Sequence, residues 1–413
     1  MEKQVFRQNK QVAYNQILFI LYTVITTIVY VLPYTKLRVP YVLAAFLMLA
    51  PMPFLLLRRD NLVKYAILLI GVSLVLFFGY LLFCDYPLAE AINEAVRNLR
   101  FFMPVLWGFY ALRYCSNKQR AFFLVVFLLM TFFILINTLQ ALQQDPWVAR
   151  LLAQSTSTSS GELNSYRLRN VGGFEFSYMM GIVTLCFVWL LLSASKIWLK
   201  LISAALVIVS FYYIIQCQYT TLLLLTFIGS ALLIFLHTHN LYVRILLVIG
   251  GIALIMGLAP LFQYLSDVFA GSLLSSKFSQ MTDALTSHDA NQLGSRPELM
   301  LQSIQNWLNS PIFGGNYENS NAHSMLLGIL EHNGLIGLGL WGYLFVQSWK
   351  KIRNVLKEKG LSSELLNIAV IYVCVLALFN PIGYVFEVTI ACYFLVPIWI
   401  SIFQRKQQAG STA

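Results

Sequence analysis

Residues 120–144 read RAFFLVVFLLMTFFILINTLQALQQ, and this stretch decides the fold class. Its only charged residue is Arg120, at the first position. An α-helix rises about 1.5 Å per residue, so a helix over this range exceeds the roughly 30 Å hydrocarbon core of a bilayer. A helix that is apolar on every side must lie in lipid or be buried in protein. The stretch therefore predicts a helix that spans a membrane.

Comparable apolar segments occupy most of the chain, and each is near the roughly 20 residues that a spanning helix needs. The fourth segment is short, and the last two are separated only around Pro381 and Gly383, so roughly 10 to 13 spans fit, with about 12 as the best count. We expect an all-α polytopic membrane protein in which residues 1–413 form a single integral membrane domain. The predicted spans are 14–32, 40–57, 64–83, 100–113, 120–144, 174–194, 198–215, 219–237, 242–259, 322–348, 364–381 and 384–403.

The composition supports this class. Hydrophobic residues make up 59% of the chain and charged residues only 11%, against roughly 25% charged in an average soluble domain. This deficit excludes a soluble enzyme, a disordered chain and a nucleic-acid-binding protein with a basic surface. The six cysteines form no C-x-x-C pair, so we expect neither a disulfide framework nor a cysteine metal site. No small-residue cleavage site follows the first apolar segment, which predicts a retained helix.

The basic residues predict the orientation, because cytoplasmic loops of membrane proteins carry an excess of Lys and Arg. If the N-terminus is cytoplasmic and every predicted span crosses, 19 of the 28 Lys and Arg residues face the cytoplasm. We therefore expect both termini in the cytoplasm. The formal net charge of +11 then reflects orientation rather than a ligand surface.

Two long connections, at residues 145–173 and 260–321, fall on the outer side in this topology. The second, large loop lies between the ninth and tenth spans. Loops longer than about 12–15 residues are usually functional or disordered, so we expect the chemistry there. No internal repeat is evident, which argues against a transporter. The two loops hold five of the nine outward basic residues, namely Arg150, Arg167, Arg169, Lys277 and Arg296.

A helix is predicted to open in the large loop at Arg296. Ser295 suits the N-cap position, Glu298 completes a capping box, and Pro297 is tolerated in the first turn. The helix is expected to end near residues 309–311. Arg296 then stands at a helix N-terminus, where free N–H groups and the helix dipole favour an anion.

The predicted tenth span begins with His323 at the outer membrane boundary. Glu331 and His332 follow about two turns deeper. Ionisable groups at such a depth cost about 2.5–3.5 kcal/mol on insertion scales, so we expect them to face protein or water rather than lipid.

These segments together resemble the O-antigen polymerase and O-antigen ligase superfamily, which are bacterial membrane glycosyltransferases of the GT-C type. The resemblance is carried by residues 294–339, and the rest of the chain matches in hydropathy and loop placement. The motifs, in chain order, are Gly-Ser-Arg-x-Glu-Leu (294–299), Ser-Pro-Ile-Phe-Gly-Gly (310–315), Ala-His-Ser (322–324) and Glu-x-x-Gly-Leu-Ile-Gly (331–337).

By this resemblance, Arg296 and His323 correspond to the family's essential arginine and histidine. The segment 169–173 (Arg-Asn-Val-Gly-Gly) looks like the family's Arg-x-x-Gly segment, with Arg167 nearby. Two positions depart from the pattern. Phe-Ser at 176–177 replaces a Pro-Asn pair, and Gln-Tyr-Thr at 218–220 replaces a Ser-Arg pair, so an arginine that contacts the lipid phosphate is absent there.

The resemblance implies transfer of a glycan from a polyprenyl diphosphate to a sugar hydroxyl, inverting and without a metal or other cofactor. Arginine suits diphosphate because its charged guanidinium forks onto phosphate oxygens, and histidine suits proton transfer. We assign His323 and Arg296 as catalytic. The predicted diphosphate-binding residues are Arg167, Arg169 and Arg296, and the candidate acceptor path consists of Glu331, His332 and Tyr317.

Each assignment has a structural alternative: a solvated helix start for Arg296, a capping residue for His323, head-group contacts for Arg167 and Arg169, and a buried pair for Glu331 and His332. The function that we favour is a polymerase of O-antigen or capsule repeat units. One alternative is a ligase that transfers the glycan to lipid A core, and another is a flippase of lipid-linked sugars. The expected partners are undecaprenyl-diphosphate-linked donor and acceptor, membrane lipids and a chain-length regulator, with no nucleic acid. The expected location is the bacterial inner membrane, with the active site facing outward.

Overall fold

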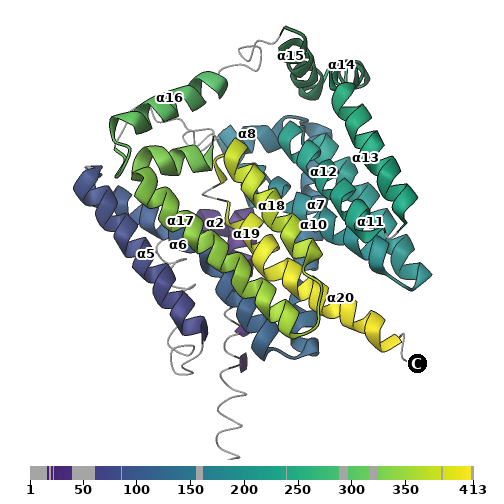
Figure 1. The fold of residues 1–413 in the computed structure, drawn as a ribbon, viewed down its shortest axis with the longest axis horizontal. Helices are drawn as coiled ribbons and strands as arrows, with labels where there is room; N and C mark the ends of the chain where they lie inside the picture. The colour runs from purple at the N-terminus through teal and green to yellow at the C-terminus, as the bar shows by residue number, and fades with distance from the viewer. Residues whose placement is uncertain are drawn as a thin grey trace, which may run out of the picture.

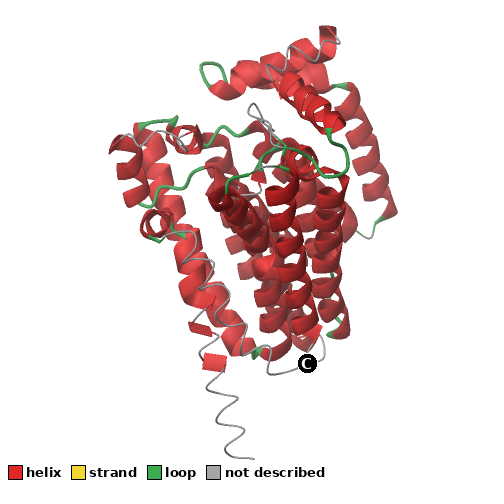
Figure 2. Ribbon diagram, turned by 90° about the vertical axis from the view of Figure 1, so that its left-hand side faces the viewer, coloured by secondary structure: helices red, strands yellow, loops and turns green. Residues whose placement is uncertain are grey.

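The computed structural model describes residues 16–39 (without 18, 19 and 22), 61–84, 86–154, 161–238, 240–287, 296–315, 324–382 and 385–410. Across these residues the regular structure is helical, without a strand (Figure 2). Long helices stand side by side, and shorter helices lie at one end of them (Figures 1 and 2). The helices before residue 238 are α2 (Pro33–Arg38), α5 (Asn61–Phe83), α6 (Leu88–Tyr114), α7 (Asn117–Gln144), α8 (Val148–Gln154), α9 (Gly161–Leu168), α10 (Phe174–Ser193), α11 (Ile197–Gln216) and α12 (Thr220–His237). Those after it are α13 (Leu241–Met256), α14 (Leu258–Val268), α15 (Leu273–Ser287), α16 (Arg296–Asn309), α17 (Met325–Glu358), α18 (Glu364–Phe379), α19 (Phe386–Ile390), the π-helical η3 (Ala391–Leu395) and α20 (Val396–Gly410).

Six helical segments in the described part of the chain are long and apolar enough to cross a membrane. A bent pair, 241–253 with 258–268, makes a seventh if it counts as one span. The predicted all-helical membrane protein is thus confirmed at this level, and the count of about 12 stays a prediction. The predicted span 40–57 lies outside the described residues. The six are Leu62–Phe83, Asn117–Gln144, Phe174–Ser193, Ile197–Gln216, Thr220–His237 and Phe386–Gln404.

Helices α6 and α17 extend well beyond their predicted spans. The short segment 100–113 is the second half of α6, whose first half carries charged residues such as Glu94 and Arg97. The segment 322–348 corresponds to α17, which continues to Glu358. In both helices the extra turns are polar, so a pattern of apolar residues marks the part of the helix in the membrane and not its ends.

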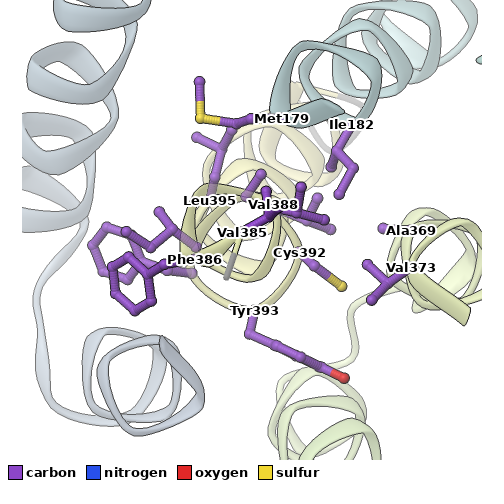
Figure 3. Close-up of a cluster of buried hydrophobic side chains, with 14 of the residues drawn as sticks. Met179, Ile182, Ala369, Val373, Val385, Phe386, Val388, Cys392, Tyr393 and Leu395 are labelled. Atoms are coloured by element: carbon purple, nitrogen blue, oxygen red, sulfur yellow. The ribbon is translucent and has the colours of Figure 1, made fainter. Parts of the chain in front are cut away.

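The centre of the bundle is the continuous helix α19–η3–α20, which is buried from Phe386 to Ile402 and packs against α10, α18 and α6 (Figure 3). Its π-helical turn packs directly against Gly108 of α6. A Cβ atom on Gly108 would lie 1.8 Å from the carbonyl oxygen of Tyr393. Only a residue without a side chain lets the two helices approach this closely.

Helix ends that the predicted topology places on one side contact each other. At the predicted outer end, Tyr34 N–H donates to Asn170 Oδ1 across 3.1 Å. At the predicted cytoplasmic end, Arg113 pairs with Glu358 across 3.4 Å. The alternation of spans is therefore consistent with the packing. We call the predicted outer end of the bundle, where Tyr34 and Asn170 lie, the loop end. Which side of the membrane the loop end faces stays a prediction.

The large loop contains three helices in the part that is described. Its first part, α14 and α15, forms a helix pair around the small cluster of Phe262, Leu274 and Phe278. Its second part, α16, lies against α17. In Figure 1 these three helices lie beyond the ends of the long helices.

Candidate functional site

The candidate site centres on a break in α17. Gly334 has φ 61° and ψ −162°, values that residues with side chains rarely adopt, and it divides the helix into 325–333 and 335–358. At a break of this kind the backbone groups on both sides lose their helical partners. Most of those groups find their partners in the turn at 310–315, which directly follows α16, and one bonds to Cys84.

The N–H groups after the break bond to this turn. In a straight helix Leu335 and Ile336 would donate to carbonyl groups four residues back. Here Leu335 N–H donates to Pro311 O across 2.9 Å, and Ile336 N–H donates to Ile312 O across 3.3 Å. A Cβ atom on Gly334 would lie 2.3 Å from Ile312 O, so the turn and the break fit each other only with glycine at this position.

The carbonyl groups before the break bond to other segments. Glu331 O accepts from Gly315 N–H across 3.1 Å, and His332 O accepts from the thiol of Cys84 across 2.9 Å. The turn contains a second glycine with positive φ, Gly314, on which a Cβ atom would lie 2.3 Å from the carbonyl carbon of His332. The motif segments 310–315 and 331–337 therefore form one interlocked unit, which we call the break unit.

Two side chains of the predicted acceptor path lie in the break unit. Glu331 is fully buried, and its Oε1 accepts from Asn306 Nδ2 of α16 across 2.5 Å. Its Oε2 has no hydrogen-bond partner among the described residues. His332 Nδ1 lies 3.2 Å from Gly315 O and 2.9 Å from the hydroxyl of Tyr86, an arrangement that suits a protonated Nδ1 donating to both. As expected, these ionisable groups face protein.

Polar residues of α5 and α6 extend this cluster. Asn333 Nδ2 donates to the hydroxyl of Tyr80 across 2.9 Å, and the rings of Tyr80 and Tyr86 stack at 5.3 Å. Nearby, Glu94 and Arg97 form an ion pair of 2.6 Å ahead of the predicted span 100–113. Burial raises the pKa of the Glu94 carboxyl above its ordinary value, even though the Arg97 charge acts in the opposite direction.

A second set of contacts links the start of α17 to α18 and α10. Ser324 caps α17, because its hydroxyl accepts from Leu327 N–H across 3.2 Å. Met325 N–H donates to Asn380 O across 3.1 Å, and Asn380 Oδ1 accepts from the hydroxyl of Tyr178 across 3.1 Å. The start of α17 is thus fixed beside Tyr178, near the start of α10, and beside Asn380, the residue that follows α18.

The same contacts continue to the first loop. The rings of Tyr178 and Tyr219 lie 5.9 Å apart, and Tyr219 donates its hydroxyl to Ala149 O across 2.7 Å. The guanidinium of Arg150, on α8, lies 5.9 Å from the centre of the Tyr219 ring. Sequence reasoning noted the missing arginine at 218–220. The structure brings an arginine of the first loop to that helix start.

Arg167 and Arg169 lie at the end of α9, where Arg167 is partly buried and Arg169 is exposed. The backbone around them is fixed by α7. Arg169 O accepts from Asn137 Nδ2 across 2.9 Å, and Gly172 N–H donates to the hydroxyl of Thr138 across 2.7 Å. Both arginines therefore lie in or beside a turn at the loop end whose backbone is hydrogen-bonded to α7.

The structure brings together some of the predicted site residues. Glu331 and His332 lie in the break unit, against α16, whose first residue is Arg296. The side chain of Arg296, together with Tyr317 and His323, lies outside the described residues. Among the residues that are described, no group of three His, Cys, Asp or Glu side chains could hold a metal ion.

Sequence reasoning missed the amide and hydroxyl partners of these residues, chiefly Asn306, Tyr86, Asn333 and Asn380. A buried amide needs hydrogen bonds, so Asn333 and Asn380, which interrupt apolar segments, carried a usable signal. A comparison of the chain with protein-family models and with curated proteins finds no match.

Proposed function

We propose that this protein is a membrane glycosyltransferase that polymerises polysaccharide repeat units. The observation that carries the proposal is the break unit. Two motif segments of the resemblance, 310–315 and 331–337, are separated in the sequence and bond to each other through backbone groups. Two of the four motif segments thus lie in one three-dimensional arrangement, and this supports the proposal.

The proposed reaction takes place on the outer face of the membrane. His323 accepts the proton of a sugar hydroxyl on the acceptor, whose oxygen forms the new glycosidic bond with inversion at the donor carbon. The bond between that carbon and the phosphate oxygen breaks, and the diphosphate leaves with its electron pair. Arg296, with Arg167 and Arg169, binds the diphosphate and stabilises the charge that develops on it. No step needs a metal ion or an organic cofactor.

Glu331 and His332 receive a positioning role in this proposal. Their hydrogen bonds to Asn306 and Gly315 hold the C-terminal end of α16 and the following turn. Since Arg296 opens the same helix, this attachment sets where Arg296 stands. An acceptor path along Glu331, His332 and Tyr317 remains a prediction.

The proposed substrates are undecaprenyl-diphosphate-linked glycans as both donor and acceptor. The proposed location is the bacterial inner membrane, with the loop end outside and both termini in the cytoplasm. This orientation is supported by the excess of basic residues at the opposite end.

The test is extension of a lipid-diphosphate repeat unit by the purified protein, with and without a chelator. We expect longer lipid-linked chains in both conditions, and nearly complete loss in Arg296→Ala and His323→Ala. Matched controls are Arg113→Ala and His237→Ala, at the predicted cytoplasmic end, which should keep wild-type activity.

Other outcomes would separate the alternatives. Transfer only to lipid A core would indicate a ligase. A flippase would instead move lipid-linked sugars across the membrane of vesicles without extending them. If Arg296→Ala and His323→Ala both keep such transport, the catalytic assignments are wrong.

A further inference from the structure

Asn380 occupies the break between α18 and α19, in extended backbone with φ −145° and ψ 150°. Its carbonyl oxygen accepts two N–H groups, from Met325 across 3.1 Å and from Ile382 across 2.9 Å. Its Oδ1 accepts from the hydroxyl of Tyr178 across 3.1 Å. The residue is 4% exposed, and its Nδ2 has no hydrogen-bond partner among the described residues.

An unpaired buried amide is informative, because most buried polar groups in folded proteins are hydrogen-bonded. Turning the amide by 180° does not remove the problem. Nδ2 would then donate to the Tyr178 hydroxyl, and Oδ1 would be left unpaired instead. In either orientation one atom of Asn380 needs a partner that the described residues do not supply.

The described partners of Asn380 lie close in sequence to two segments of the proposed site. Met325, whose N–H is bonded to Asn380, follows the proposed base His323 by two residues. Tyr178 lies in α10, which begins directly after the turn that carries Arg169. Asn380 therefore connects the segment of the histidine with the helix that follows the first-loop arginines, at the loop end of the bundle.

Other polar atoms nearby are already occupied. The hydroxyl of Ser324 caps α17, and the first N–H of that helix is bonded to Asn380 O. The Tyr178 hydroxyl donates to Asn380, which holds the plane of the carboxamide. With the Tyr178 hydroxyl bonded to Oδ1, the Nδ2 donor, which lacks a partner in the described part of the chain, has a fixed direction, as a substrate-binding group requires.

We propose that the carboxamide of Asn380 donates a hydrogen bond to an oxygen of the lipid-linked glycan substrate. This inference rests on the proposed function and adds a neutral binding group to its arginines. Tyr178 is a positioning residue, because it touches the amide and orients it. The acceptor oxygen belongs to the diphosphate or to the adjoining sugar, and the two sources respond differently to a negative charge.

The test compares Asn380→Ala with the wild-type protein in the extension assay on purified full-length protein. We expect the KM for the lipid-diphosphate substrate to rise about tenfold or more, as for the loss of a hydrogen bond to a charged or polar ligand. The thermal unfolding midpoint without substrate should change little, because the variant removes an unpaired buried donor but also the acceptor of the Tyr178 hydroxyl. Asn367→Ala is the control, since this asparagine of α18 bonds to Trp349 at the opposite end of the helix.

Asn380→Asp identifies the source of the oxygen. It keeps an acceptor for the Tyr178 hydroxyl and replaces the donor by an acidic group. A further large loss of activity relative to Asn380→Ala indicates a phosphate oxygen, because the two negative charges repel. Recovery toward the wild type indicates a sugar hydroxyl, which donates to a carboxylate. The Tyr178→Phe variant should show a smaller rise in KM, since it leaves the amide present and less well oriented.

A wild-type KM in Asn380→Ala, or a lower unfolding midpoint with an unchanged KM, would overturn the inference and leave a purely structural residue or a buried water site. Such a result leaves the proposed function standing, because the wild-type protein would still extend the substrate. If the wild-type protein neither extends nor binds undecaprenyl diphosphate, the proposed function fails, and this inference fails with it.

Discussion

Replacing Gly334 by Ala should release the turn at 310–315 from α17. The added Cβ atom would lie 2.3 Å from Ile312 O, 2.4 Å from Ile312 C and 2.7 Å from Phe313 N. These are backbone atoms, which cannot rotate away as a side chain does. The substitution also places a side chain at φ 61° and ψ −162°, a region that is essentially restricted to glycine.

Two effects determine the free energy by which Gly334→Ala weakens the attachment of the turn to α17. Holding a non-glycine residue in such a conformation costs about 1–3 kcal/mol. Relieving the contact with Ile312 requires the turn to move, which breaks the bonds to Leu335 and Ile336, each worth about 0.5–1.5 kcal/mol. We expect the attachment of the turn to weaken by about 3 kcal/mol in total.

Hydrogen exchange followed by mass spectrometry measures this weakening directly. Local opening that becomes easier by about 3 kcal/mol accelerates the exchange of the amides concerned roughly a hundredfold. The change should be confined to peptides that cover 310–315 and 331–337. Glycan extension should fall as well, because α16 loses its attachment.

Gly339→Ala and Gly342→Ala are the controls, because both glycines lie in the same helix with no atom within 4 Å of an added Cβ. Alanine is favoured over glycine in a helix by about 1 kcal/mol, so neither should accelerate exchange. If Gly334→Ala exchanges at the wild-type rate in both peptides, the interlocked unit described above is wrong.

Three further predictions concern other contacts. Glu331→Ala should speed proteolysis within the large loop, because Asn306 loses its hydrogen-bond acceptor. Glu331→Gln keeps an acceptor oxygen and should resist proteolysis like the wild-type protein. Equal cleavage of the two variants would contradict this prediction. Gly108→Ala should lower the thermal unfolding midpoint through its collision with Tyr393 O, and an unchanged midpoint shows that the helices can separate at no cost. Because burial raises the pKa of Glu94, its ionisation opposes folding. The wild-type midpoint, relative to Glu94→Gln, should therefore fall as pH rises from below 4.5 through the raised pKa, and a relative rise would mean that ion pairing dominates.

Hydropathy alone predicts most of the long helices, because a run of apolar residues long enough to cross a bilayer has few alternatives. The range 174–194, for example, corresponds to α10 at 174–193. The helix from Arg296 to Asn309 was also predictable, since capping residues and a following Ser-Pro pair mark its ends. Local sequence thus determines where these helices begin and end.

The break at Gly334 could not be predicted in this way. A single glycine within a helical pattern is usually tolerated, and nothing local distinguishes Gly334 from Gly339 or Gly342. The difference arises from the turn at 310–315, whose backbone groups replace the helical partners. For the same reason, the pairing of Asn306 with Glu331 is a tertiary property that no single segment of sequence contains.

The described hydrogen bonds between α16 and the break unit lie near one end of this helix. Its 14 residues extend about 20 Å, and the contacts described here, at Asn306 and in the turn beyond Asn309, all lie near its C-terminal end. A rotation of about 10° around that end would displace the backbone of Arg296 by about 3 Å, roughly the length of one hydrogen bond. In the proposed reaction, a small change in the break unit would therefore decide whether the guanidinium of Arg296 reaches a phosphate.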